Sequence, residues 1–264
     1  MVDAQREYQQ TFYDDHYAGR DDVVRAQLAH PLFRSWQDRL AARVLDLSEG
    51  GSRGPDGSLR VFEPGCGEGF LASGLLRVAG ERGITVDYAG GDLSRSALEL
   101  ARPALGDNLE VGDATELVAA LPADSRDLII IKNLLHHLED PAGLLRASAR
   151  AVGPGGRVAI VEARLGCPQF LLFSVLAPKR EKYYFYGAQR NRKAVEAAGL
   201  RMERADKFSW LPYELALHIR YGAGRKLLSS DSPAMIKRFS DADDRLTRAA
   251  PWLSSYVVWV TRPA

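Results

Sequence analysis

The sequence predicts an α/β fold in which a mainly parallel sheet is covered by helices on both faces. Three observations lead to this prediction. Short apolar segments alternate with helical segments from residue 59 onward, the segment 127–131 is almost entirely apolar, and a glycine-rich turn follows the first apolar segment. Alternation at this spacing is typical of parallel strands joined by helices, and an apolar strand is typical of the middle of such a sheet.

Length and composition favour one soluble domain with additional helical segments. The chain has 264 residues, of which 46% are hydrophobic and 26% are charged, and its formal net charge is +1. This apolar content argues against disorder, and the near-zero charge provides no basic field to attract nucleic acid. There is no apolar run long enough for a transmembrane segment and no apolar signal core at the N-terminus, so we expect a cytoplasmic protein.

The sequence also argues against a disulfide framework and against a metal site. Cysteine occurs twice, as Cys66 and Cys167, which is too few for either a framework or a four-cysteine zinc site. The histidines His136 and His137 are adjacent rather than four residues apart, and this spacing does not suit a metal. We therefore expect no metal, and an inert thiol at Cys66.

The first 49 residues are expected to form a helical lid on a main domain that covers residues 50–264. Residues 1–22 are polar and aromatic, whereas residues 23–47 carry apolar side chains at helical spacing. Pro31 is expected to divide this segment into two helices.

Seven strands are expected in the main domain, at 59–62, 84–91, 109–111, 127–131, 157–161, 200–208 and 255–260. Helices are expected at 70–78, 94–101, 141–152 and 191–198, the second of them with Ser94 as its N-cap. Two insertions interrupt this pattern. One, near 164–187, is rich in aromatic residues and cations, and the other, near 212–250, has a helical pattern.

The glycine-rich turn is the sharpest local motif, with the sequence Glu63-Pro64-Gly65-Cys66-Gly67-Glu68-Gly69. Glycines allow a tight turn and a close approach to a ligand, and the amides of the following helix favour an anion. A dinucleotide-binding turn needs its third glycine one residue later, where this chain has Phe70, and no Walker-type lysine follows. The carboxylate of Glu63 would repel a pyrophosphate but suits an ammonium group.

This motif resembles the first motif of class I S-adenosylmethionine-dependent methyltransferases. Three further matches follow in the order of that family: Gly91-Asp92-Leu93-Ser94, Gly112-Asp113-Ala114, and the run from Asp127 to Pro141. The resemblance covers about residues 58–163. It implies a Rossmann-like, doubly wound, seven-stranded sheet whose last strand is antiparallel, with S-adenosyl-L-methionine as the cofactor.

The resemblance also implies roles for acids at three strand ends. Asp92 would accept hydrogen bonds from the ribose hydroxyls, Asp113 from the adenine amino group, and Glu63 from the ammonium group. Asp87 competes with Asp92 for the ribose but lies within its strand. The cofactor-binding residues that we expect are Glu63, Gly65, Gly67, Asp92, Leu93, Asp113, Ala114, Asn133 and Tyr17.

Two histidines are the candidates for catalysis. His136 and His137 follow the fourth expected strand, beside the expected position of the methyl group. A histidine titrates near neutral pH and suits a general base. We expect His136 to face the acceptor and His137 to brace the turn, with the opposite assignment left open.

Aromatic segments are candidates for the rest of the pocket. Tyr13, Tyr17 and Arg20 resemble the N-terminal lid of small-molecule methyltransferases, and Trp210, Tyr213, His218 and Tyr221 lie in the late insertion. The run 179–186 mixes cations with aromatic residues, which fits an aromatic or lipid-like acceptor and also fits a packed loop.

Together these observations predict methyl transfer to the oxygen or carbon of a small molecule, as in quinone-like or natural-product biosynthesis. The alternatives are an RNA or protein methyltransferase, a catalytically silent S-adenosylmethionine-binding protein, and a nicotinamide enzyme. Phe70 and Glu63 disfavour the last of these. The sequence does not indicate an oligomeric state.

Overall fold

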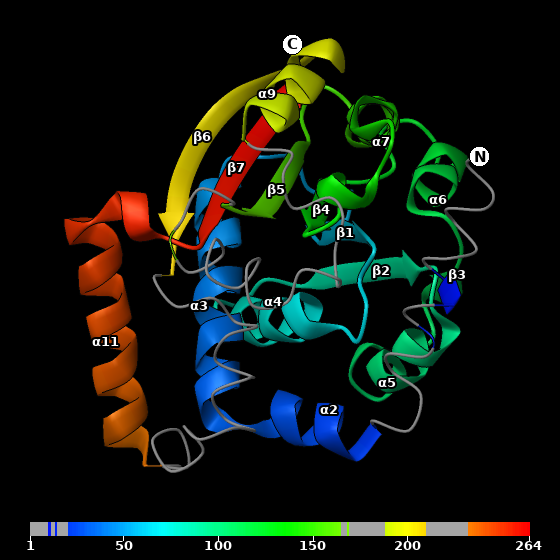
Figure 1. The fold of residues 1–264 in the computed structure, drawn as a ribbon. Helices are drawn as coiled ribbons and strands as arrows, with labels where there is room; N and C mark the ends of the chain where they lie inside the picture. The colour runs from blue at the N-terminus through cyan, green and yellow to red at the C-terminus, as the bar shows by residue number, and fades with distance from the viewer. Residues whose placement is uncertain (1–9, 12–13, 15–20, 165–167, 169–187, 210–231) are drawn as a thin grey trace.

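The computed structural model describes residues 10, 11, 14, 21–164, 168, 188–209 and 232–264 (Figure 1). These residues form one sheet with helices on both of its faces. The strands are β1 (Leu59–Pro64), β2 (Val86–Asp92), β3 (Leu109–Val111), β4 (Leu128–Lys132), β5 (Arg157–Ala163), β6 (Leu200–Phe208) and β7 (Tyr256–Pro263).

The described strands form a seven-stranded sheet in the order β3-β2-β1-β4-β5-β7-β6. β1 to β5 pair in parallel, whereas β7 is antiparallel to both of its neighbours. This topology confirms the predicted doubly wound sheet with an antiparallel last strand. Because β1 lies between β2 and β4, the carboxyl ends of these three strands meet at one edge, where open α/β sheets bind their ligands.

The helices are α2 (Asp21–Ala29), α3 (Pro31–Leu47), α4 (Phe70–Glu81), α5 (Arg95–Leu105), α6 (Ala114–Ala120), α7 (Pro141–Val152), α9 (Ala188–Ala197) and α11 (Pro233–Ala249), with short 3₁₀ turns η1 (Leu135–His137) and η3 (Pro251–Leu253). Alternate residues of β4 point to opposite faces: Leu128 and Ile130 pack with α3 and α4, and Ile129 and Ile131 pack with α6 and α7. Within the described part of the chain, none of these helices has the length and apolar character needed to cross a bilayer.

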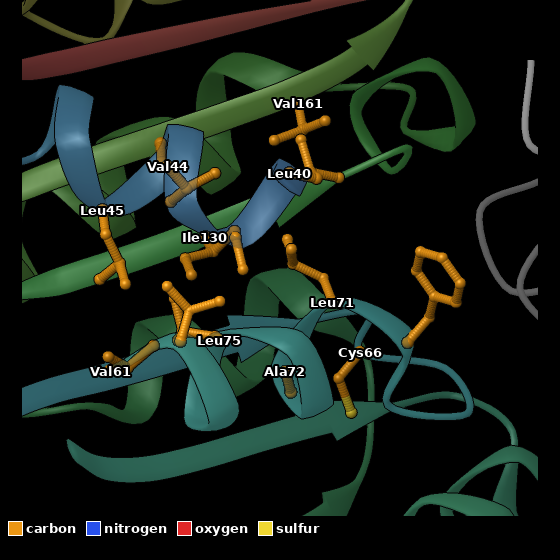
Figure 2. Close-up of a cluster of buried hydrophobic side chains, with 14 of the residues drawn as sticks. Leu40, Val44, Leu45, Val61, Cys66, Leu71, Ala72, Leu75, Ile130 and Val161 are labelled. Carbon is orange, nitrogen blue, oxygen red and sulfur yellow. The ribbon is translucent and has the colours of Figure 1, made fainter. Parts of the chain in front are cut away.

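Helix α3 is part of the hydrophobic core. This helix lies within residues 1–49, the segment that is expected to form a lid. Leu40 and Val44 are fully buried, and Figure 2 shows them, with Leu45, facing the side chains of α4 and the sheet. The predicted break at Pro31 is present, because Pro31 occupies the first position of α3 and α2 ends at Ala29. Only the residues before α3 remain for a lid, and that role stays a prediction.

Other element boundaries differ modestly from the expected ones. Helix α6 was not expected, because it is short and has only two buried large apolar residues, Leu117 and Val118. Strand β5 continues beyond Val161 to Ala163, so Glu162 lies inside the sheet.

Helix α11, the described part of the late insertion, is anchored to α3 and β6 by a buried polar network. The Trp36 indole Nε1 donates to Ser209 Oγ over 3.0 Å, and Ser209 Oγ donates to Asp243 Oδ2 over 3.0 Å. Arg39 pairs with the same carboxylate at 2.7 Å, which compensates the burial of Asp243. Helix α11 therefore packs beside the last strands of the sheet, and residues 210–231 connect β6 to it outside the described part.

Candidate functional site

The glycine-rich turn leaves the carboxyl end of β1 with its main chain in the left-handed region. Gly65, Gly67 and Gly69 have φ values of 69°, 55° and 77°. A Cβ at Gly65 would lie 3.2 Å from Leu134, and one at Gly69 would lie 2.8 Å from Leu105. Side chains would therefore be strained here, and the turn presents bare backbone at the sheet edge.

Asp92, the last residue of β2, joins this turn to the start of α5. Its Oδ2 accepts a hydrogen bond from the Gly67 amide over 2.8 Å, and its Oδ1 accepts one from the Ser94 amide over 2.9 Å. Burial raises the pKa of this carboxyl to about 6, although both amides favour its ionised form. Each oxygen has a further lone pair, so Asp92 is able to hold the turn and accept ligand hydroxyls at the same time. The next residue, Leu93, is half-buried.

The N-terminal part of the chain reaches this site through one described residue. Ser94 caps α5 by accepting from the Ala97 amide, and its hydroxyl donates to Asp14 Oδ1 over 2.6 Å. Other predicted site residues lie outside the described residues: Tyr13, Tyr17, Arg20, Trp210, Tyr213, His218, Tyr221 and most of the segment 164–187.

Asp113 and Ala114 lie where β3 gives way to α6. Asp113 Oδ1 accepts from the amides of Thr115 and Glu116 over 2.8 and 3.1 Å, so Asp113 is the N-cap of α6. Ala114 is buried. This capping role is compatible with the predicted adenine contact, because the carboxylate is only half-buried at the sheet edge.

Glu63 lies beneath the turn and is 1% exposed. Tyr88 donates its hydroxyl hydrogen to Glu63 Oε2 over 3.0 Å. Burial raises the pKa of Glu63 to about 8, although the nearby Lys132 ammonium acts in the opposite direction. Without a ligand, Glu63 is therefore mostly protonated at neutral pH. The thiol of Cys66 is also buried, and burial raises its pKa well above the ordinary value, so this thiol stays protonated.

Replacement of Glu63 by glutamine is expected to remove part of the pH dependence of stability. Since the folded pKa is raised, Glu63 contributes stability below about pH 4.5, and this contribution is lost as the pH rises towards 8. The expected difference is about 1.4 kcal/mol for each unit by which the pKa is raised. Urea unfolding of ligand-free wild type and Glu63→Gln at pH 5 and pH 8 measures it. Equal pH dependence in the two proteins would contradict this assignment.

The turn after β4 is held by Glu162, a buried carboxylate on β5. Its Oε1 accepts from the amides of Leu134 and Leu135 over 3.0 and 2.8 Å, and its Oε2 lies 2.7 Å from His136 Nδ1. His136 is 4% exposed. Glu162 therefore fixes both the main chain of η1 and the orientation of one predicted catalytic ring.

His137 and Asn133 flank this pair. The His137 ring is half-buried, and its centroid lies 4.1 Å from that of His136. Burial, with a smaller effect of His136, holds the pKa of His137 well below its ordinary value. Asn133 has a φ of 48°, and its buried Oδ1 has no hydrogen-bond partner among the residues that the structure describes. A buried amide oxygen without a partner is costly, and a bound donor would satisfy it.

The structure thus brings the predicted residues Glu63, Gly65, Gly67, Asp92 and Asn133 to one edge of the sheet. It adds three side chains that the sequence reasoning missed: Tyr88, Lys132 and Glu162. Glu162 had a usable signal, since it is an acid near the carboxyl end of an apolar strand. Among the described residues, no group of three or more metal-ligating side chains gathers in one place.

The site fits S-adenosylmethionine on two structural observations. The amide of Gly67 in the glycine-rich turn lies beside the carboxylate of Asp92, and the Asn133 amide oxygen has no partner among the described residues. Comparison with known proteins agrees, because residues 62–160 match the family described as a methyltransferase domain.

Residues 62–160 of this chain form a methyltransferase domain. The chain is 33% identical over 159 residues to the ubiquinone biosynthesis O-methyltransferase of Thiobacillus denitrificans, covering 58% of this chain and 66% of that protein. It is 38% identical over 122 residues to the protein of the same name from Alkalilimnicola ehrlichii, covering 44% and 46%. The match therefore spans about half to two thirds of these relatives.

Solved structures share the fold of the methyltransferase domain. A SAM-dependent methyltransferase from Archaeoglobus fulgidus matches with a TM-score of 0.57 at 16% identity, covering 86% of this chain and 93% of that one. A phosphoethanolamine N-methyltransferase from Haemonchus contortus, bound to S-adenosylhomocysteine, matches with a TM-score of 0.55 at 17% identity, covering 86% and 53%. At these identities the likeness concerns the fold.

Proposed function

We propose that this protein transfers a methyl group from S-adenosylmethionine to a small-molecule acceptor in the cytoplasm. The observation that carries the proposal is the position of Asp92. Its carboxylate bridges the glycine-rich turn and the start of α5 at the sheet edge, and the described residues occupy only half of its lone pairs, which leaves acceptors for a ligand diol. The similarity to ubiquinone biosynthesis O-methyltransferases supports an aromatic hydroxyl with a lipid-like substituent as the acceptor.

Each residue of the edge has a defined task in this proposal. Asp92 accepts from the ribose hydroxyls, Asp113 from the adenine amino group, and Glu63 from the ammonium group. Bound S-adenosylmethionine supplies an activated methyl group. The protein must then mainly align the acceptor with that group, and alignment alone provides a large acceleration.

The His136–Glu162 pair supplies a base for an acceptor hydroxyl. An ionised carboxylate only accepts hydrogen bonds, so Glu162 keeps the proton of His136 on Nδ1 and leaves Nε2 as the basic atom. The carboxylate also stabilises the imidazolium that forms when the base takes up a proton. Burial holds the pKa of His137 well below its ordinary value, which makes this ring a poor base, and we assign it to bracing η1.

Thermal unfolding with candidate cofactors tests the cofactor part of the proposal. S-adenosylmethionine and S-adenosylhomocysteine should stabilise the protein, by about 2.7 kcal/mol at a hundred times the dissociation constant, whereas NAD should not. Stabilisation by NAD alone would indicate a nicotinamide enzyme and overturn the proposal.

Incubation with methyl-labelled cofactor tests the transfer itself. Hydroxylated aromatic acceptors, with and without a prenyl chain, should acquire label that mass spectrometry places on oxygen. RNA and a protein lysate serve as comparison acceptors. Tight cofactor binding with no label in any small molecule would contradict a small-molecule methyltransferase and favour one of the alternatives.

A further inference from the structure

Lys132 is a half-buried cation at the edge where the site lies. It is the last residue of β4, and strand alternation places its side chain on the face of Leu128 and Ile130, towards α4. Its ammonium nitrogen lies 5.4 Å from the centre of the Phe70 ring, and Phe70 is the first residue of α4 after the glycine-rich turn. The charge therefore lies close to the turn.

No counterion for Lys132 is present among the residues that the structure describes, since no carboxylate there forms an ion pair with its ammonium group. Glu63 is close enough to interact with this charge, but it forms no ion pair with Lys132, and its Oε2 accepts a hydrogen bond from Tyr88 over 3.0 Å. A partly buried charge is costly without a partner. The arrangement therefore favours an anionic group from a ligand.

The start of α4 favours an anion at the same place. Gly69 caps this helix without a side-chain hydrogen bond, and its first turn has no acidic residue. The first amides of a helix and its positive dipole end attract negative charge. Lys132 and this helix start thus suit an anionic group, while the neighbouring Glu63 suits a cationic one. An α-amino acid carries both.

We propose that Lys132 binds the carboxylate of the methionine part of S-adenosylmethionine. This inference rests on the proposed function and adds to it a residue that selects the zwitterionic end of the ligand. Lys132 then binds the carboxylate and Glu63 binds the ammonium group, which are attached to the same α-carbon of the ligand. A ligand that lacks either group should therefore bind more weakly.

Calorimetry with two ligands and four proteins tests the inference. The ligands are S-adenosylmethionine and its decarboxylated analogue, which lacks only the carboxylate. The proteins are wild type, Lys132→Met, Lys132→Gln and the matched control Lys193→Met, in which an exposed lysine of α9 is replaced. Loss of a charge-assisted contact should weaken S-adenosylmethionine binding about 10- to 100-fold in both Lys132 variants. Binding of the decarboxylated analogue should change little, and the control should behave as wild type.

Several results would overturn the inference while leaving the proposed function in place. The first is an unchanged affinity for S-adenosylmethionine in both Lys132 variants. The second is an equal loss of affinity for both ligands, because this would indicate that Lys132 only shapes the site. A raised acceptor KM with normal cofactor affinity would assign the anion to the acceptor instead. By contrast, a wild-type protein that binds neither ligand would overturn the proposed function itself. Circular dichroism identifies any variant that fails to fold. If one of the two Lys132 variants does not fold, the affinities of the other one test the inference.

Discussion

Replacement of His136 by alanine should lower kcat by about 10²–10⁴-fold for a hydroxyl acceptor, because it removes the general base. Cofactor affinity should stay close to that of wild type, since no cofactor contact is proposed for this ring. Steady-state kinetics and calorimetry measure the two effects. The matched control is His137→Ala, which should affect the melting temperature more than kcat.

Replacement of Glu162 by glutamine tests the same base through its orientation. Glutamine still offers an oxygen to the amides of Leu134 and Leu135, but it no longer supplies a carboxylate to His136. Since a carboxylate stabilises the imidazolium, its loss should move the acid limb of the pH–rate profile to lower pH. The ring of His137 packs against that of His136, so the measurement is repeated in the His137→Ala background, where the shift should persist.

Two outcomes would change the catalytic assignment. Full kcat in His136→Ala, with loss of activity but not of stability in His137→Ala, would exchange the roles of the two rings. Full kcat in both variants would contradict a histidine base and leave alignment as the source of the proposed rate acceleration.

Replacement of Gly67 by valine should abolish cofactor binding at concentrations that saturate wild type. The backbone at Gly67 has a φ of 55°, which a β-branched residue adopts only with strain, and its amide donates to Asp92. Asp92→Ala should lower affinity at least tenfold, because it removes acceptors for the ribose hydroxyls and releases the turn. Calorimetry with S-adenosylhomocysteine measures both losses.

Asp87→Ala is the matched control for Asp92→Ala, because Asp87 is an exposed carboxylate on the same strand, β2. It should bind the cofactor as wild type does. Loss of affinity in Asp87→Ala with normal affinity in Asp92→Ala would reverse the ribose assignment.

The central strands were predictable because β1, β4 and β5 are short, mostly apolar segments between turns, whereas β6 carries five charged residues among its nine. The helix over residues 31–47 was also predictable, but the residues against which it packs were not. Trp36 packs with ring centroids 5.0 Å from Phe208 and 5.4 Å from Tyr256, residues far along the chain, and local periodicity carries no information about such contacts.

The sequence predicts those site residues that directly follow a strand. It does not predict those whose role depends on a contact with the main chain of another segment. Asp92 stands at a strand end, so the position alone suggested it. Glu162 is explained only by the amides of Leu134 and Leu135, which the sequence does not distinguish from any other amides. For Asp113 the sequence offers an adenine contact or a turn position, and its capping of α6 could not be predicted because that helix was not expected.

The network of Trp36, Ser209 and Asp243 has a consequence for how this protein changes over evolution. It joins α3, early in the chain, to β6 and α11 near its end. A substitution that removes one partner leaves buried polar groups unsatisfied, at a cost of about 1–3 kcal/mol. These three positions, although far apart in the sequence, are therefore expected to change together rather than singly.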